Sequence, residues 1–164
     1  MERYEFDTPA ENWHRKLRRL YEHWLGMHPT PGALPGRQHF APSDVADLVP
    51  LIWGLEVHRS PLRFRYCLVG EAHAKAMQRE LQGLWMDEAH AEFIKSYFYR
   101  HYVNVVNQRL PSYRRGRARY RAAPELFEME RIMLPMAANG RDVDMILALT
   151  VYYHRDGTEA LAQS

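Results

Sequence analysis

The sequence predicts an α+β fold: one domain with an antiparallel sheet and helices grouped between its second and third strands. Strand-like segments occur first as an adjacent pair, at 51–59 and 62–70, and later as a group of three, at 113–121, 126–136 and 142–153. Helical patterns lie before the pair and between the two groups. Consecutive strands of this kind pair antiparallel, whereas a doubly wound sheet would alternate strand with helix.

Composition sets limits on the class of protein. The 164 residues suffice for one domain with a core and an extra segment. A net charge of +2 implies no polyanionic partner, and Cys67 alone excludes an internal disulfide or a thiolate metal cluster. The N-terminus lacks the apolar core of a signal peptide, and no apolar run approaches the roughly 18 residues of a membrane span. We therefore expect a cytoplasmic protein with no membrane partner.

The first helix is predicted from its cap and its apolar spacing. Thr8 suits the N-cap, Pro9 the first helical position, Glu11 a capping box and Gly26 the stop. Apolar residues then recur every three or four positions, at Trp13, Leu17, Leu20, Tyr21, Trp24 and Leu25. This stripe must be buried either against the chain's own domain or against a second copy.

The next segments are a connector and further helices. Prolines and glycines prevent regular structure over 27–41, and a short helical turn is expected within 42–50. A short helix is predicted over 71–81 and a long one over 86–110. The apolar stripe of the long helix is Ile94, Tyr97, Phe98, His101, Tyr102 and Val105.

The stretch 131–150 predicts a hairpin closed by Asn139-Gly140, a dipeptide that favours a type I′ turn. Its second arm hardly alternates, so that strand is expected to be covered on both faces. Closing the turn pairs Met133 with Ile146, Arg131 with Ala148 and Met129 with Thr150. Closing the preceding loop pairs Arg121 with Leu126, Arg119 with Glu128 and Arg117 with Glu130.

This register assigns two faces to the sheet. One face suits a covering helix and carries Ile132, Leu134, Met145, Leu147 and Leu149, with Arg117, Arg119, Glu128 and Glu130 at its far end. The other mixes methionine with small residues, which leaves room for a cavity, and carries Met129, Arg131, Met133, Ile146, Ala148 and Thr150, continuing to Ala118 and Tyr120.

The segments 34–57, 62–83 and 129–150 resemble a family of small, stand-alone bacterial PAS proteins. The likeness lies in spacing: a Pro-x-Arg segment, a Pro-bounded turn, a strand ending in Val-Gly, a Leu-Gln-Gly break, and Leu-Pro before a hairpin. The resemblance implies sheet order 2-1-5-4-3, a ligand between sheet and central helices, and pairing through an N-terminal helix on the outer face. It divides the chain into a helix and connector (1–42), a PAS-like domain (43–156) and a polar, frayed tail (157–164).

Candidate ligand-binding residues follow from the cavity face and from aromatic residues elsewhere. They are Trp53, Tyr66, Trp85, Tyr97, His101, Met129, Arg131, Ala148 and Thr150. Aromatic and methionine stripes are equally typical of a plain core. Arg131 could bind a ligand carboxylate or phosphate with both guanidinium nitrogens, or pair with an acid such as Glu71 or Glu92. The candidate dimer interface is Trp13, Leu17, Leu20 and Trp24.

Other chemistries have weaker support. His101 is a candidate haem ligand, with a core histidine as the alternative. The histidines lack metal-ligand spacing, so no metal site is predicted. The run 109–121 holds six arginines and two tyrosines, but no nucleic-acid-binding motif accompanies it. No nucleophile with a base and no phosphate loop is visible, and no catalytic residue is predicted.

These observations predict a sensory or regulatory domain that binds a small, largely apolar ligand. The ligand would shift the packing of the first helix and so a homodimer or partner contact, with an unknown signalling protein as output. The alternative is a ligand-free dimerisation module. A haem sensor and a small-molecule enzyme remain lesser alternatives.

Overall fold

The computed structural model of the chain describes residues 9–118 and 123–161. Its sheet runs in the order β2-β1-β5-β4-β3, every described pair is antiparallel, and a short β6 pairs with β5. The strands are β1 (Ile52–His58), β2 (Arg63–Val69), β3 (Ser112–Arg117), β4 (Glu128–Met136), β5 (Met145–Tyr153) and β6 (Glu159–Ala160). The predicted α+β class and strand order are confirmed.

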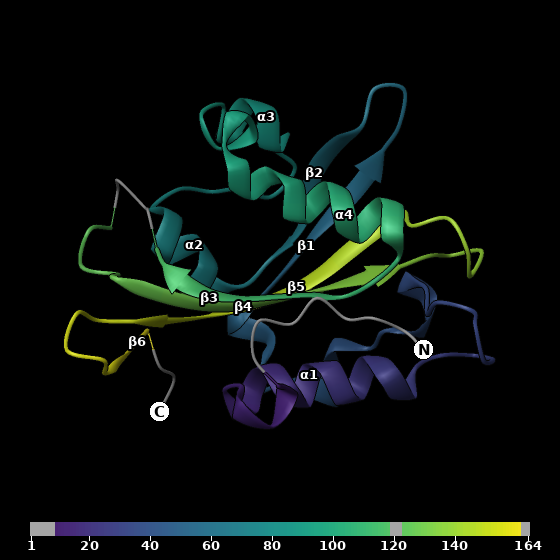
Figure 1. Cartoon of the computed structure of the whole chain (residues 1–164), viewed down its shortest axis with the longest axis horizontal. Helices are drawn as coiled ribbons and strands as arrows, with labels where there is room; N and C mark the ends of the chain where they lie inside the picture. Colours follow the sequence, from purple (N-terminus) through teal and green to yellow (C-terminus); the bar gives the residue numbers. More distant parts are fainter. Residues whose placement is uncertain (1–8, 119–122, 162–164) are drawn as a thin grey trace.

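Helices cover the sheet on both faces (Figure 1). One layer holds α2 (Glu71–Met77), α3 (Met86–Ala89) and α4 (Arg100–Gln108), and α1 (Arg15–Gly26) lies on the opposite face. Short 3-10 turns occupy the connections: η1 (Ala10–Asn12), η2 (Arg37–His39), η3 (Pro42–Val45), η4 (Val49–Leu51), η5 (Phe93–Lys95) and η6 (Tyr97–Tyr99). Within the described residues, no helix has the length and apolar character to cross a bilayer.

The first helix packs its stripe against its own sheet. Trp13, just ahead of α1, and Leu17, Leu20 and Trp24 within it are each at most 4% exposed. The Trp24 indole N–H donates to the Pro135 carbonyl of β4 at 2.9 Å. The side chains predicted for a dimer interface are therefore buried within a single chain. A second copy could reach them only if α1 left the sheet.

The start of this helix was predicted wrongly. Pro9 precedes the separate turn η1, and α1 begins only at Arg15. His14 is the N-cap, and its Nδ1 accepts the Lys16 backbone N–H at 3.1 Å. Thr8, the predicted cap, lies outside the described residues.

The single helix predicted over 86–110 is also wrong. His90 ends α3 with φ −135° and ψ 56°, and Ser96 is extended, with ψ 159°, between η5 and η6. Only Arg100–Gln108 forms a continuous helix, which ends at the left-handed Arg109. The apolar spacing of the sequence does not reveal these breaks, because a 3-10 turn also brings residues three apart onto one side.

The β4–β5 register lies two residues from the predicted one. Arg131 pairs with Thr150 and Met133 with Ala148. The connection spans 137–144, and Gly140, with φ +80°, has the positive φ that Asn139 lacks, so the turn is not type I′. The Asn139 side chain instead accepts the N–H groups of Arg141 and Asp142. Because side chains alternate with period two, this shift leaves both predicted faces intact.

The β3–β4 register shifts in the same way. Glu128 pairs with Arg117 and Glu130 with Arg115, instead of Arg119 and Arg117. The predicted pairs of Arg119 and Arg121, together with Tyr120, lie outside the described residues.

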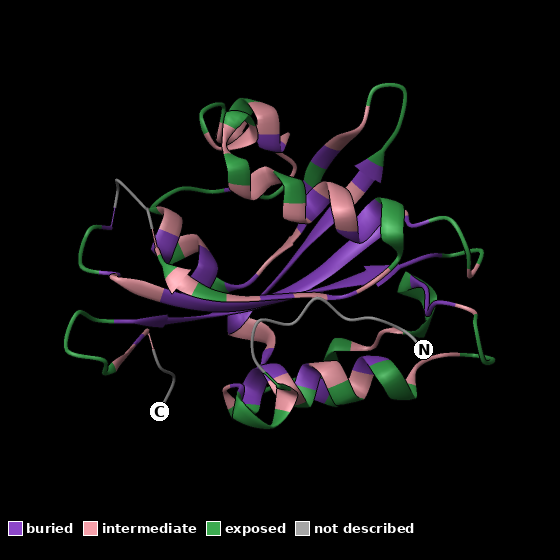
Figure 2. Ribbon diagram, viewed as in Figure 1, coloured by how far each residue is buried: buried purple, intermediate pink, exposed green. Residues whose placement is uncertain are grey.

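Both faces of β5 are covered, as predicted, and all nine of its residues are buried. Figure 2 shows the central strands almost entirely buried, with exposed residues concentrated on helices and loops. The tail was expected to be frayed, but its Glu159 and Ala160 pair with Tyr153 and Tyr152.

Candidate functional site

A cavity of about 820 Å³ lies between the central helices and the sheet. This volume is within the roughly 300–1,000 Å³ range of small-molecule sites. The lining residues come from β1, β2, β3, β4 and β5 below and from α2, α3, η5 and α4 around the sides. Its rim carries the exposed residues Arg79, Glu88, Glu92 and Arg117.

Aromatic rings form much of the wall. The Trp53 ring lies 6.2 Å from that of Tyr102 and 6.4 Å from that of Tyr66, measured between centroids. Phe93 contacts Tyr102 edge-on at 5.3 Å. Met129 and Met86 are also buried lining residues. Such a surface suits a flat or flexible apolar molecule.

Polar groups cross the floor in one row. Arg114 on β3 pairs with Arg131 on β4, and Arg131 pairs with Thr150 on β5. All three line the cavity. Arg131 is 3% exposed and its Nη1 lies 3.5 Å from the Ser112 carbonyl oxygen. The Thr150 hydroxyl accepts the Trp53 indole N–H at 2.9 Å, which fixes that ring against the sheet.

A second polar region is formed by two histidines. His73 of α2 stacks on Trp53 with ring centroids 5.0 Å apart, and its Nδ1 lies 2.6 Å from the Tyr152 hydroxyl. Burial lowers the pKa of His73 to about 3, so this imidazole is neutral at pH 7. Among the described residues its Nε2 has no hydrogen-bond partner. His90 Nε2 lies 2.8 Å from the Tyr66 hydroxyl, and burial lowers the pKa of His90 as well.

Of the predicted ligand-binding residues, Trp53, Tyr66, Met129, Arg131 and Thr150 line this cavity. Ala148 is the cross-strand partner of Trp53 on the same face of the sheet, but it does not line the cavity. Of the two acids named as alternative partners of Arg131, Glu71 lies 3.0 Å from Lys75, and Glu92 is exposed at the cavity rim.

Three predicted residues lie elsewhere. Trp85 packs beside His58, under the Arg63 guanidinium at 4.0 Å from its ring centroid. Tyr97 is 67% exposed. His101 lines a separate hollow. Tyr97 lies in the 3-10 turn η6 and not in α4, so it leaves the stripe that a continuous helix would have formed. His101 lies on α4 directly before Tyr102, and successive helix residues point about 100° apart, so Tyr102 lines the cavity and His101 does not.

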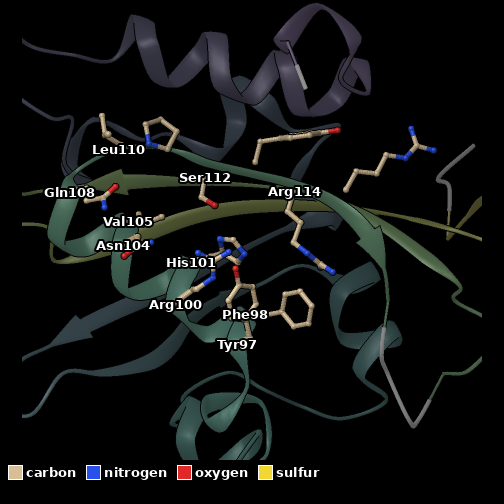
Figure 3. Close-up of a pocket in the computed structure, with 13 residues that line it drawn as sticks. Tyr97, Phe98, Arg100, His101, Asn104, Val105, Gln108, Leu110, Ser112 and Arg114 are labelled. Carbon is tan, nitrogen blue, oxygen red and sulfur yellow. The ribbon is translucent and has the colours of Figure 1, made fainter. Parts of the chain in front are cut away.

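The separate hollow, of about 270 Å³, lies between α4 and β3 (Figure 3). His101 lines it together with the polar residues Arg100, Asn104, Gln108 and Ser112. His101, the candidate haem ligand, therefore lines a smaller and more polar space than the aromatic cavity. Within residues 9–118 and 123–161, no group of three or more His, Cys, Asp or Glu side chains is placed to hold a metal ion.

Sequence reasoning did not place His73, His90, Phe93, Tyr102 or Arg114 in the cavity. His90 and Phe93 lie in the irregular stretch after α3, where no regular pattern predicts which way a side chain faces. His73 carried a local signal: it lies between alanines in a short helix, and both Ala72 and Ala76 are buried. Small residues four apart on one helix face indicate that the helix approaches the sheet closely. This signal would have placed His73, next to Ala72, near the interior.

Fold and site together define an α+β protein with a ligand-sized cavity between an antiparallel sheet and its helical layer. No protein-family model matches the chain. Searches of curated proteins and of solved structures likewise find no significant match.

Proposed function

We propose that this protein is a PAS-like sensory or regulatory domain that binds a small, largely apolar ligand. The observation that carries the proposal is the cavity of about 820 Å³, with its aromatic wall and its short row of polar groups. The sheet order β2-β1-β5-β4-β3, with helices on both faces, supports the PAS-like assignment.

The sheet offers a route from ligand to output. Arg131 faces the cavity, and its neighbour Glu130 faces α1, where it accepts the backbone N–H of His14 at 2.7 Å. A ligand that shifts β4 would change how α1 packs, and with it the surface offered to a partner protein. A homodimer through the α1 stripe would require undocking of the helix, whereas a partner could contact its exposed side without this change.

Native mass spectrometry of gently purified protein tests the proposal. We expect an excess mass that disappears in the denatured spectrum, and an absorbance scan would reveal haem or flavin. Ala89 lines the cavity and is half-buried, so Ala89→Trp should fill the space and abolish the excess mass. Ala46→Trp, at an exposed position outside the cavity, should retain it.

A protein with no excess mass and no visible absorption bands, or an excess mass that Ala89→Trp leaves unchanged, would contradict ligand sensing in this cavity. The ligand-free interaction module would then be the better account of the fold.

A further inference from the structure

We propose, building on the ligand-binding function above, that the cavity selects organic acids. A carboxylate binds at Arg131 and Arg114, and the apolar body of the molecule lies against Trp53, Tyr102 and Met129.

Two positive charges lie side by side on the floor. Arg114 and Arg131 are direct cross-strand neighbours, and both side chains line the cavity. Like charges at directly opposed positions of a sheet repel each other. A carboxylate between the two side chains would offset this repulsion. Arginine also fits this ligand well, because its planar fork donates two parallel hydrogen bonds to the two carboxylate oxygens.

An aromatic ring lies beside each of the two guanidinium groups. Arg131 lies 5.8 Å from the Tyr102 ring centroid, and Arg114 lies 4.3 Å from that of Phe98. Both rings line the cavity. A ring at this distance attracts the guanidinium through a cation–π interaction and restricts its position. This arrangement holds the donors in place before the ligand binds, which lowers the entropic cost of binding.

Charge is distributed unevenly around the lining. Among the described residues, four arginines and two glutamates line the cavity, so its field favours an anion. Both glutamates, Glu88 and Glu92, are exposed at the rim, and Glu88 lies 3.5 Å from Arg63. At the other side of the cavity His73 is neutral, because burial lowers its pKa to about 3. The positive charge of the floor is thus carried by the arginine row, which fixes the orientation of an acid.

The apolar part of the ligand follows from the remaining surface. Trp53, Tyr102 and Met129 are each at most 8% exposed and face the same space as the arginine row. A small polyacid would leave this surface unfilled. An acid with one carboxylate and an aromatic or alkyl body matches both parts.

Binding of 2-naphthoate and of its amide, 2-naphthamide, tests the inference. The two molecules share a ring system and differ in the charge of the carboxyl group. By isothermal titration calorimetry we expect the acid to bind at least about tenfold more tightly than the amide, since a charge-assisted bidentate contact is lost in the amide. Decanoate and decanamide provide a second matched pair with an alkyl body.

Variants assign this preference to residues. Arg131→Met and Arg114→Met should each reduce the preference for acid over amide, while amide binding changes little. Arg131 is buried, so Arg114→Met, at a half-buried position on the edge strand, serves if the first variant fails to fold. Arg141→Met is the matched control, because Arg141 is exposed and lies in the 137–144 connection, outside the cavity.

The outcomes separate this inference from the function on which it rests. Equal binding of acid and amide, or an acid preference that survives both cavity variants, would overturn acid selection and leave apolar ligand binding standing. Failure of both acids and both amides to bind would overturn acid selection and would also count against a ligand-binding cavity.

Discussion

His73 is a titratable side chain placed where its charged form is unfavourable. It is 2% exposed, stacks on Trp53, and lies beside the Tyr152 hydroxyl. His90 faces the same region and, like His73, has its pKa lowered by burial. The folded protein therefore excludes a proton that the unfolded chain accepts, and this links stability to pH.

We predict that stability falls as the pH is lowered from about 6.5, the ordinary pKa of histidine, towards 3. The pKa of His73 is about 3 in the folded protein, so its contribution is fully present above 6.5 and is lost on acidification. One proton corresponds to a slope of up to about 1.4 kcal/mol per pH unit. Urea denaturation at successive pH values measures the slope.

His73→Phe should reduce the slope of stability against pH by up to about 1.4 kcal/mol per pH unit, the contribution of one proton. This holds whatever the effect of the substitution on absolute stability. His154→Gln, a change of an exposed histidine, should leave it unaltered. An unchanged slope in His73→Phe would show that another group takes up the proton.

At the scale of elements, sequence reasoning recovered the faces of the strands but not their register. Alternation assigned Arg131 and Thr150 to one face correctly, because it depends only on local period. The register depends on a contact with a distant segment. The Leu34 N–H donates to Gly140 and the Ala137 N–H to Pro35, each at 2.8 Å, so the connector holds the 137–144 loop open. The Asn-Gly signal contains no information about that partner.

For the candidate site, too, sequence reasoning placed residues correctly only where a local pattern determines their position. Met129 and Arg131 were identified from alternation, and Trp53 and Tyr66 as aromatic residues on predicted strands. His101 was misplaced because it lies directly before Tyr102 on α4, and two successive helix residues cannot both face the cavity. Tyr97 was misplaced because it follows the break at Ser96, where the hydroxyl donates to the Phe93 carbonyl at 2.6 Å. That local hydrogen bond competes with a continuous helix, and apolar spacing does not reveal which arrangement is the more stable.

Glu130 joins α1 to the sheet. It is fully buried, and its oxygens accept hydrogen bonds from the Tyr113 hydroxyl at 3.0 Å, the Tyr153 hydroxyl at 2.8 Å and the His14 backbone N–H. Burial and the neighbouring Glu130 raise the pKa of both tyrosines, so each hydroxyl remains a donor. Arg115 lies 3.7 Å from the same carboxylate.

We predict that Glu130→Gln lowers the free energy of unfolding by about 2–3 kcal/mol, because an amide cannot accept all of these hydrogen bonds. Glu128→Gln is the matched control two residues away on β4. It removes a partly exposed ion pair with Arg115, and should cost less than about 1 kcal/mol. Chemical denaturation measures both, and similar losses would contradict the special role of the buried carboxylate.

At the scale of the whole molecule, the sheet is a layer shared by two sites. The cavity lies on one face and α1 on the other, and β4 contributes alternate residues to each (Figure 1). If ligand binding favours one packing of α1, then a change in that packing must alter ligand affinity by the same factor. Glu130 allows a test of this reciprocity, since it does not line the cavity.

We predict that Glu130→Gln weakens 2-naphthoate binding by about fivefold or more, the lower end of typical coupling between sites. Glu128→Gln should bind the acid as the unmodified protein does. In parallel, hydrogen exchange should show that 2-naphthoate slows exchange along α1 in the unmodified protein, and less so in Glu130→Gln. Unchanged affinity in a folded Glu130→Gln variant would mean that the cavity and α1 are independent. Signalling would then have to leave the cavity through the helical layer that covers it, and not through the sheet.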